Sequence, residues 1–225
     1  MRRTLGLLAC VLGLAATPSS GGWVVITMEE LPTALHAGEP TTFVFTLRQH
    51  GMTLLTDRHP TVTLQAPGAG WFARRNRVEA RTIGTGRYAA TVTPRDTGPV
   101  EIVVDADFMN NRARLLPIPV LAAGADVPRL TAVARGQQLF VGKGCVECHV
   151  KEDDPVVYER NDVHIGPDLS GRTFPVAYLR QKLDDPSVNR VRTNDWVVMP
   201  TLGLTDDEIS ALVSYLNAPV STAAR

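Results

Sequence analysis

The sequence contains little cysteine, no net charge and only one long apolar run. Three cysteines in 225 residues are too few for a scaffold held together by disulfides. The 23 Lys and Arg residues balance 23 Asp and Glu residues, so the chain lacks the basic excess of nucleic-acid-binding proteins. Hydrophobic residues make up 44%, which excludes a mainly disordered chain. The length predicts one large or two small globular domains, with no nucleic-acid partner.

The apolar run lies at the N-terminus and indicates export. It follows Arg2 and Arg3, extends from Leu5 to Ala16 and is followed by small residues. This pattern predicts a signal peptide over residues 1–20. The run is shorter than the roughly 20 residues that span a bilayer, which leaves an uncleaved anchor as the alternative. Lipidation of Cys10 is a second alternative. We therefore expect a periplasmic or otherwise exported protein that is not integral to the membrane, with membrane association through a partner left open.

Residues 21–121 have the pattern of a β-sandwich. Short apolar or alternating segments are separated by Gly, Pro, Asn and Asp residues. About seven such segments within a hundred residues predict an all-β, immunoglobulin-like sandwich. The Cys…Trp…Cys signature of antibody domains is missing. The expected strands are Trp23–Met28, Thr41–Leu47, Thr61–Leu64, Val78–Ile83, Arg87–Thr93, Val100–Asp105 and Arg114–Leu121.

The periodicity becomes helical after a linker predicted over residues 122–130, which belongs to a segment rich in proline and alanine. Apolar residues at helical spacing begin at Val133 and again at Val176. A third helix is predicted from Thr205, where a Thr-x-x-Glu capping box precedes an apolar stripe. Three short helices would leave a thin core for residues 131–218, so a large apolar group should fill its centre. Residues 219–225 form a tail.

The segment Cys145-Val146-Glu147-Cys148-His149 is the attachment motif of c-type haem. Two thiols at this spacing can add to the two vinyl groups on one porphyrin edge, and the adjacent imidazole can bind the iron. A zinc site would need further ligands, and no other cysteine remains after cleavage of the signal peptide. A thioredoxin-like redox pair would need a βαβ context, which is missing. The motif therefore predicts one covalent haem c, with iron.

Further motifs in residues 131–218 resemble the class I monohaem cytochrome c family, which implies an all-α fold. Arg135-Gly136-Gln137-Gln138-Leu139-Phe140 resembles the family's first helix, and Thr205–Leu216 resembles its last. His164-Ile165-Gly166-Pro167-Asp168-Leu169 resembles the loop whose proline carbonyl accepts a hydrogen bond from the iron-binding histidine. The resemblance thus implies that Pro167 orients His149. Val198-Met199-Pro200 resembles the loop that supplies the second iron ligand.

The expected iron ligands are His149 and Met199. Met199 is the only methionine after Met109, and His164 is the rival that would give two histidine ligands. A His/Met pair leaves no open position on iron and suits transfer of single electrons by Fe(III)/Fe(II) cycling. We therefore expect no catalytic residues and no enzyme activity; an enzyme would need an open or labile sixth position. The expected partners are redox proteins of a respiratory or photosynthetic chain. Trp196, Arg190 and Arg192 are candidates for contacting the haem propionates, or else solvated loop residues.

The β-sandwich resembles the FixH-like or YtkA-like family of exported domains. The resemblance lies in Ala37-Gly38-Glu39-Pro40-Thr41-Thr42-Phe43 and Phe45-Thr46-Leu47-Arg48-Gln49-His50-Gly51. It departs from the anchored members, because no transmembrane helix remains after cleavage. The resemblance implies either a docking element or, as the alternative function, an assembly factor for a respiratory oxidase that binds copper or a client protein. The candidate copper ligands are His36, His50, His59, Met28 and Met52.

Overall fold

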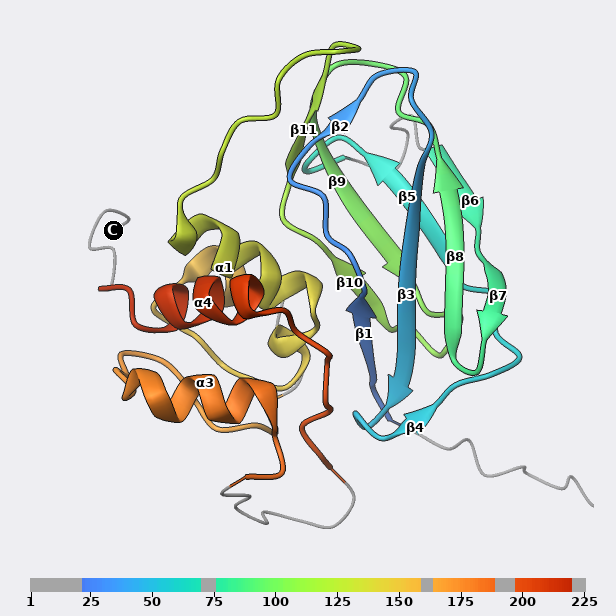
Figure 1. Ribbon diagram of the computed structural model, residues 1–225. Coiled ribbons are helices and arrows are strands. Elements are labelled where there is room, and N and C mark those ends of the chain that lie inside the picture. Colours follow the sequence, from blue (N-terminus) through green and yellow to red (C-terminus); the bar gives the residue numbers. More distant parts are fainter. Residues whose placement is uncertain (1–21, 70–75, 159–163, 189–196, 220–225) are drawn as a thin grey trace, which may run out of the picture.

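The computed structural model describes residues 22–69, 76–158, 164–188 and 197–219. The chain begins with two β-sheets and continues into a helical region that lies along one side of them (Figure 1). The predicted signal peptide, and all but the first residue of the predicted tail, lie outside the described residues. Among the described residues, no helix has the length and apolarity needed to cross a membrane.

The two sheets enclose a common apolar core, which confirms the predicted N-terminal β region. One sheet has the order β1 (Val24–Met28), β3 (Thr41–Gln49), β8 (Arg87–Val92) and β7 (Arg81–Gly84), with β4 (Thr53–Leu54) paired to β3. The other has the order β2 (Leu35–His36), β11 (Ile118–Leu121), β9 (Gly98–Asp105), β5 (Thr61–Gln65) and β6 (Asn76–Glu79), with β10 (Arg112–Arg114) paired to β9. Phe45, Tyr88, Val62 and Ile102 are buried between them. We call β1–β11 the β-domain; its immunoglobulin-like character stays a prediction.

The structure corrects two of the expected strands. The segment expected as one strand over Val78–Ile83 divides at Ala80, because β6 pairs with β5 in one sheet and β7 pairs with β8 in the other. The N–H of Ala80 donates to the carbonyl of Pro60 at 2.8 Å, where the chain changes sheets. The segment expected over Arg114–Leu121 divides into β10 and β11. Pro117 lies in the gap and has no N–H to continue a ladder.

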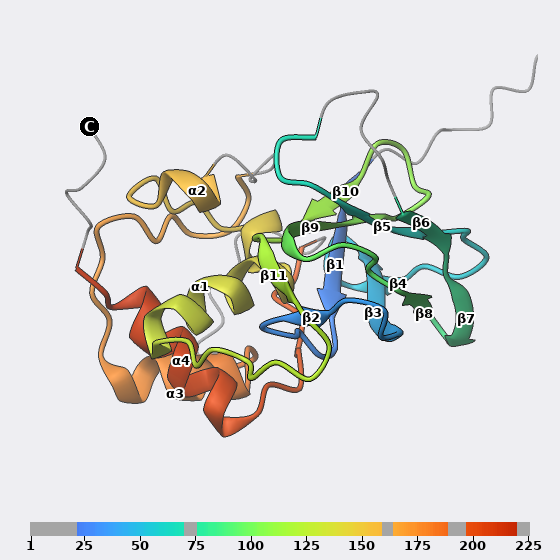
Figure 2. The ribbon, with the colours of Figure 1, turned by 90° about the horizontal axis from the view of Figure 1, so that it is seen from above.

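The helical region contains the three expected helices: α1 (Ala132–Gly142), α3 (Val176–Asp184) and α4 (Asp206–Leu216). Two short elements, η1 (Cys145–Glu147, a 3₁₀ turn) and α2 (Pro155–Tyr158), are additional. The side chain of Thr205 accepts from the N–H of Glu208, whose carboxylate accepts from the N–H of Thr205, so the predicted capping box is present. α1 packs across α4, and α3 packs against α4 (Figure 2).

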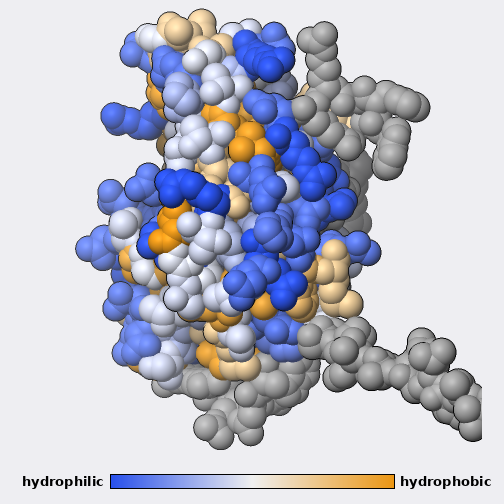
Figure 3. Space-filling view, turned by 90° about the vertical axis from the view of Figure 1, so that its right-hand side faces the viewer, coloured by the Kyte–Doolittle hydropathy of each residue, from blue (hydrophilic) through white to orange (hydrophobic). Residues whose placement is uncertain are grey.

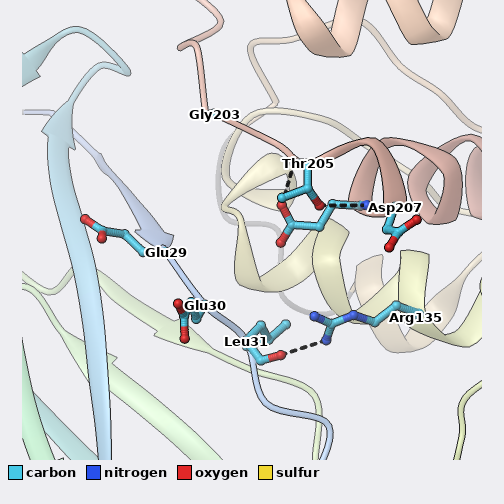
Figure 4. Close-up of a pocket in the computed structure, with 8 residues that line it drawn as sticks. Glu29, Glu30, Leu31, Arg135, Gly203, Thr205 and Asp207 are labelled. Carbon is cyan, nitrogen blue, oxygen red and sulfur yellow. Dashed lines mark hydrogen bonds between the residues drawn. The ribbon is translucent and has the colours of Figure 1, made fainter.

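The outer face of the β-domain, turned away from the helices, carries mostly hydrophilic side chains with apolar ones scattered among them (Figure 3). The opposite side contacts the helical region through β1, β10 and the turn that follows β1. Arg135 of α1 donates to the carbonyl of Leu31 at 2.8 Å, and Lys143 donates to the carbonyl of Glu29 at 2.7 Å. A cleft of about 640 Å³ runs between this turn and the start of α4 (Figure 4). The turn after β1 is therefore fixed by polar contacts to the first turn of α1 and to its C-cap.

Lys143 is a buried cation at this junction, and removing the negative charge of its partner Glu208 gives a testable prediction. Its side chain is 2% exposed, and its Nζ lies 2.8 Å from Oε1 of Glu208. Removing one partner of a buried pair leaves an uncompensated charge. We expect Glu208→Gln to lower the free energy of unfolding by about 3 kcal/mol, since glutamine retains the capping-box acceptor. Denaturant unfolding of the haem-loaded protein measures the loss.

The matched control is Thr205→Ala, which removes the cap and leaves the ion pair. It should cost about 1 kcal/mol. Lys143→Met, which removes the charge together with its need for a partner, should cost less than Glu208→Gln. Equal losses in the Thr205 and Glu208 variants would show that the buried cation does not depend on this carboxylate.

Candidate functional site

The site begins at a tight turn directly after α1. Gly144 enters it with a φ of +80°, and the N–H of His149 donates to the carbonyl of Cys145 at 3.0 Å. The turn η1 and the two residues that follow it therefore carry Cys145, Cys148 and His149 within five consecutive positions. A side chain at Gly144 would lie 2.7 Å from the carbonyl oxygen of Ile26, so glycine permits β1 to approach this turn. Neither thiol forms a disulfide.

Both thiols are held in their neutral form. Burial, followed by the neighbouring Cys148, raises the pKa of Cys145 to about 12. Burial raises the pKa of Cys148 to about 11, opposed by the nearby indole of Trp23. Zinc ligation and disulfide exchange both use the thiolate. The surroundings of this pair therefore favour neither of those two chemistries in the absence of a metal.

The imidazole of His149 has a fixed orientation. Its Nδ1 lies 2.9 Å from the carbonyl oxygen of Pro167, which can only accept, so Nδ1 carries the proton and Nε2 the lone pair. Burial lowers the pKa of His149, opposed by this hydrogen bond, which favours the neutral, metal-binding form. A side chain at Gly166 would lie 2.7 Å from Nδ1, so glycine is required for this approach. Backbone hydrogen bonds from Ile165 and Gly166 to the carbonyl of Cys148 tie the loop to the turn.

Met199 lies on a separate segment, before α4. It is partly buried and packs against the same apolar core as Cys145. His164, the rival ligand, is exposed, and its ring centroid lies 6.1 Å from that of Tyr158. The structure thus brings Cys145, Cys148, His149 and Pro167 together and leaves His164 at the surface. The propionate candidates Arg190, Arg192 and Trp196 lie outside the described residues.

The three histidines among the candidate copper ligands are engaged in other contacts. His36 lies 2.8 Å from the carbonyl of Ala125, and His59 lies 2.9 Å from the carboxylate of Glu79. Met28 is fully buried in the core of the β-domain, whereas Met52 is 40% exposed. Within the described ranges, no group of three or more His, Cys, Asp or Glu side chains is arranged to hold a metal ion. The third histidine, His50, packs its ring on Trp23 with centroids 4.4 Å apart.

Sequence reasoning missed Trp23 as a residue of this site. It was assigned only to a strand, yet its side chain is 9% exposed and lies close to Cys148. The two residues are far apart in sequence, and no motif links them. Only the packing of β1 on the turn brings them together.

Comparison with known proteins identifies a protein family for the helical region. Residues 133–218, less than half of the chain, match the family model described as cytochrome c. No curated protein matches the chain. Among solved structures, the ZirS C-terminal domain is 12% identical with a TM-score of 0.32, covering 54% of this chain and 84% of that one.

Two further solved structures are similar at the same level. The CARDB domain of a Pyrococcus furiosus protein is 13% identical with a TM-score of 0.28, covering 44% of this chain and 89% of that one. Domains 1–6 of the surface layer protein SbsC are 19% identical with a TM-score of 0.31, covering 44% of this chain. This chain spans only 13% of that protein. These TM-scores carry no argument about fold or function.

The residues of the turn fit haem c. They supply two neutral thiols on one turn and a neutral imidazole whose Nδ1 is held by a carbonyl. Such a hydrogen bond is the usual support of a metal-binding histidine. The cytochrome c family binds haem c covalently, with iron, and its members transfer electrons through that group. Residues 133–218 therefore form a cytochrome c domain whose cofactor is haem c, and this domain follows an N-terminal β-sheet domain.

Proposed function

We propose that the protein is an exported carrier of single electrons with one haem attached through Cys145 and Cys148. His149 and Met199 bind the iron, and Pro167 orients His149. The observation that carries the proposal is the 2.9 Å hydrogen bond from His149 to the carbonyl of Pro167, directly beside the two thiols. It fixes the proton on Nδ1, so that Nε2 is the nitrogen that binds iron.

The chain's own residues set the conditions for electron transfer. Haem iron supplies a one-electron Fe(III)/Fe(II) couple. The carbonyl of Pro167 holds the imidazole in one orientation, which limits reorganisation when the charge on the site changes. Val146 and Val150 are buried, which limits the access of water to the turn on their side. A thioether from Met199 in the sixth position would close the iron to ligands and favour the ferrous form, so we propose a carrier without enzyme activity.

The signal sequence and the two-part architecture suggest where the carrier works. Cytochrome c domains are typically exported, and residues 1–20 have the pattern of a secretory signal. We propose a periplasmic protein that exchanges electrons with a respiratory or photosynthetic complex. The β-domain, an immunoglobulin-like sandwich of the FixH-like type over residues 21–121, serves as its docking element. Residues 122–130, which join β11 to α1 without a helix or strand, act as the linker to the domain at 131–218.

The deciding experiment is an optical spectrum of the purified protein, oxidised and reduced, with and without carbon monoxide. The proposal requires a low-spin ferrous spectrum, a methionine-to-iron charge-transfer band in the ferric protein, and no binding of carbon monoxide. A high-spin ferric spectrum or ready binding of carbon monoxide would overturn the assignment of Met199 and favour an enzyme or a gas sensor.

Replacement of Met199 by alanine is expected to open the iron. The ferric charge-transfer band should disappear, carbon monoxide should bind, and the midpoint potential should fall by a sizeable part of the roughly 0.8 V range that axial ligands span. Met109→Ala is the control, because that methionine is 61% exposed on the β-domain. A Met199 variant with the spectrum and potential of the parent would assign the sixth position to another group.

A further inference from the structure

The N-terminal end of β1 contacts the haem-attachment turn. The indole of Trp23 lies close to Cys148, and the carbonyl of Ile26 and side chain of Val25 lie against Gly144. An added Cβ at Gly144 would meet these two groups at 2.7 and 2.8 Å, so the backbone of the turn lies directly on the strand. The β-domain therefore touches the turn at both Gly144 and Cys148.

The turn between β3 and β4 contacts the segment that carries Met199. Gly51 is buried and has a φ of +74°, and a Cβ added to it would lie 2.4 Å from the carbonyl oxygen of Val198. The ring of its neighbour His50 packs on that of Trp23, with centroids 4.4 Å apart and planes tilted by 42°. Gly22 also lies close to His50, because a Cβ there would meet Nε2 at 2.3 Å. The histidine ring thus packs against Gly22 and Trp23, the two residues that precede β1.

These contacts form one continuous row from Cys148 through Trp23, His50 and Gly51 to Val198. We propose that Trp23, His50 and Gly51 form a wall of the haem site, which we call the β-wall. They are positioning residues that hold the Cys148 turn and the Met199 segment at a fixed separation and cover that side of the site from water. This inference rests on the proposed roles of Cys148 and Met199.

The β-wall has a consequence for electron transfer. It is built from an indole, an imidazole and a glycine backbone, and Trp23 is only 9% exposed. Exclusion of solvent around a haem destabilises the ferric form, which carries the greater charge, and so raises the midpoint potential.

The test uses the full-length, haem-loaded protein with Trp23→Ala, Trp23→Phe and His59→Ala. We expect Trp23→Ala to lower the midpoint potential by about 59 mV, which is a tenfold shift in the reduced-to-oxidised ratio for one electron. Trp23→Phe, which keeps a large apolar ring, should restore most of that shift. His59→Ala is the matched control in the same domain, because its side chain is 77% exposed and pairs with Glu79; it should leave the potential unchanged.

A second variant tests the other end of the β-wall. Gly51→Val places a side chain against the carbonyl of Val198 and should weaken the methionine-to-iron charge-transfer band in the ferric protein. If the parent protein lacks that band, the proposed function fails whatever the variants do. If the parent shows it, and neither Trp23→Ala nor Gly51→Val moves the potential or the band, the β-wall is wrong and the proposed function stands. Should Trp23→Ala not fold, Trp23→Phe and Gly51→Val still decide the matter.

Discussion

Replacing both Cys145 and Cys148 by serine is expected to abolish covalent attachment of the haem. Each thioether requires a sulfur, and these are the only cysteines after residue 20. Serine has nearly the shape of cysteine, so the buried turn beside Val146 should accept it. The parent protein should retain its haem through denaturing electrophoresis and acidified organic extraction, and the double variant should lose all of it.

The single variants Cys145→Ser and Cys148→Ser distinguish covalent attachment of the haem from its noncovalent binding. Each keeps one thiol, so each should retain haem through a single thioether, and the reduced absorption band should move toward that of haem with one remaining vinyl group. Val146→Ala is the matched control, since it changes a buried residue of the same turn and leaves both sulfurs in place. Haem that resists extraction from the double serine variant would refute attachment through this motif.

The elements that could be predicted from sequence are those with local signals. The start of α4 is determined by a Thr-x-x-Glu capping box and three acidic residues in the first turn. The turn that carries Cys145 and Cys148 has a motif of five residues, whose spacing is itself the chemical requirement. The hydrogen bond from His149 to Pro167 was implied only by family resemblance, and the structure contains it at 2.9 Å.

The elements that sequence reasoning missed depend on contacts distant in sequence. The chain changes sheets at Ala80 because β5 and β8 supply different partners on its two sides, and the alternating pattern of Val78–Ile83 contains no sign of this. Trp23 looked like the first residue of a strand, yet its indole reaches Cys148. A Trp in a β-strand pattern is compatible with any buried surface, so its partner is decided by the packing of one domain on the other.

The close crossing of α1 and α4 leads to the second large expected effect. A Cβ added at Gly136 would lie 2.1 Å from the carbonyl oxygen of Ala211 and 2.5 Å from Cβ of Tyr215, both on α4. Alanine inside a helix is ordinarily more stable than glycine by about 1 kcal/mol. Backbone atoms cannot move aside singly, so the two helices must separate. We expect Gly136→Ala to lower the free energy of unfolding by about 3 kcal/mol despite its better helix propensity.

The direction of the change in unfolding free energy decides between the two effects. Helix propensity alone predicts that Gly136→Ala is stabilising, whereas the close packing of α1 on α4 predicts that it is destabilising. Gly84→Ala is the control: its nearest neighbour would be a side-chain atom of Arg87 at 3.7 Å, so it should change stability little. Denaturant unfolding of the haem-loaded proteins compares the two, and a gain in stability for Gly136→Ala would contradict the close crossing. Separation of the two helices should also disturb the haem site, because α1 leads directly into the turn of Cys145. On the other side of the motif, the hydroxyl of Tyr215 in α4 donates a hydrogen bond to the carboxylate of Asp154 at 2.8 Å. Helices that separate at Gly136 must therefore displace the residues on both sides of the attachment motif.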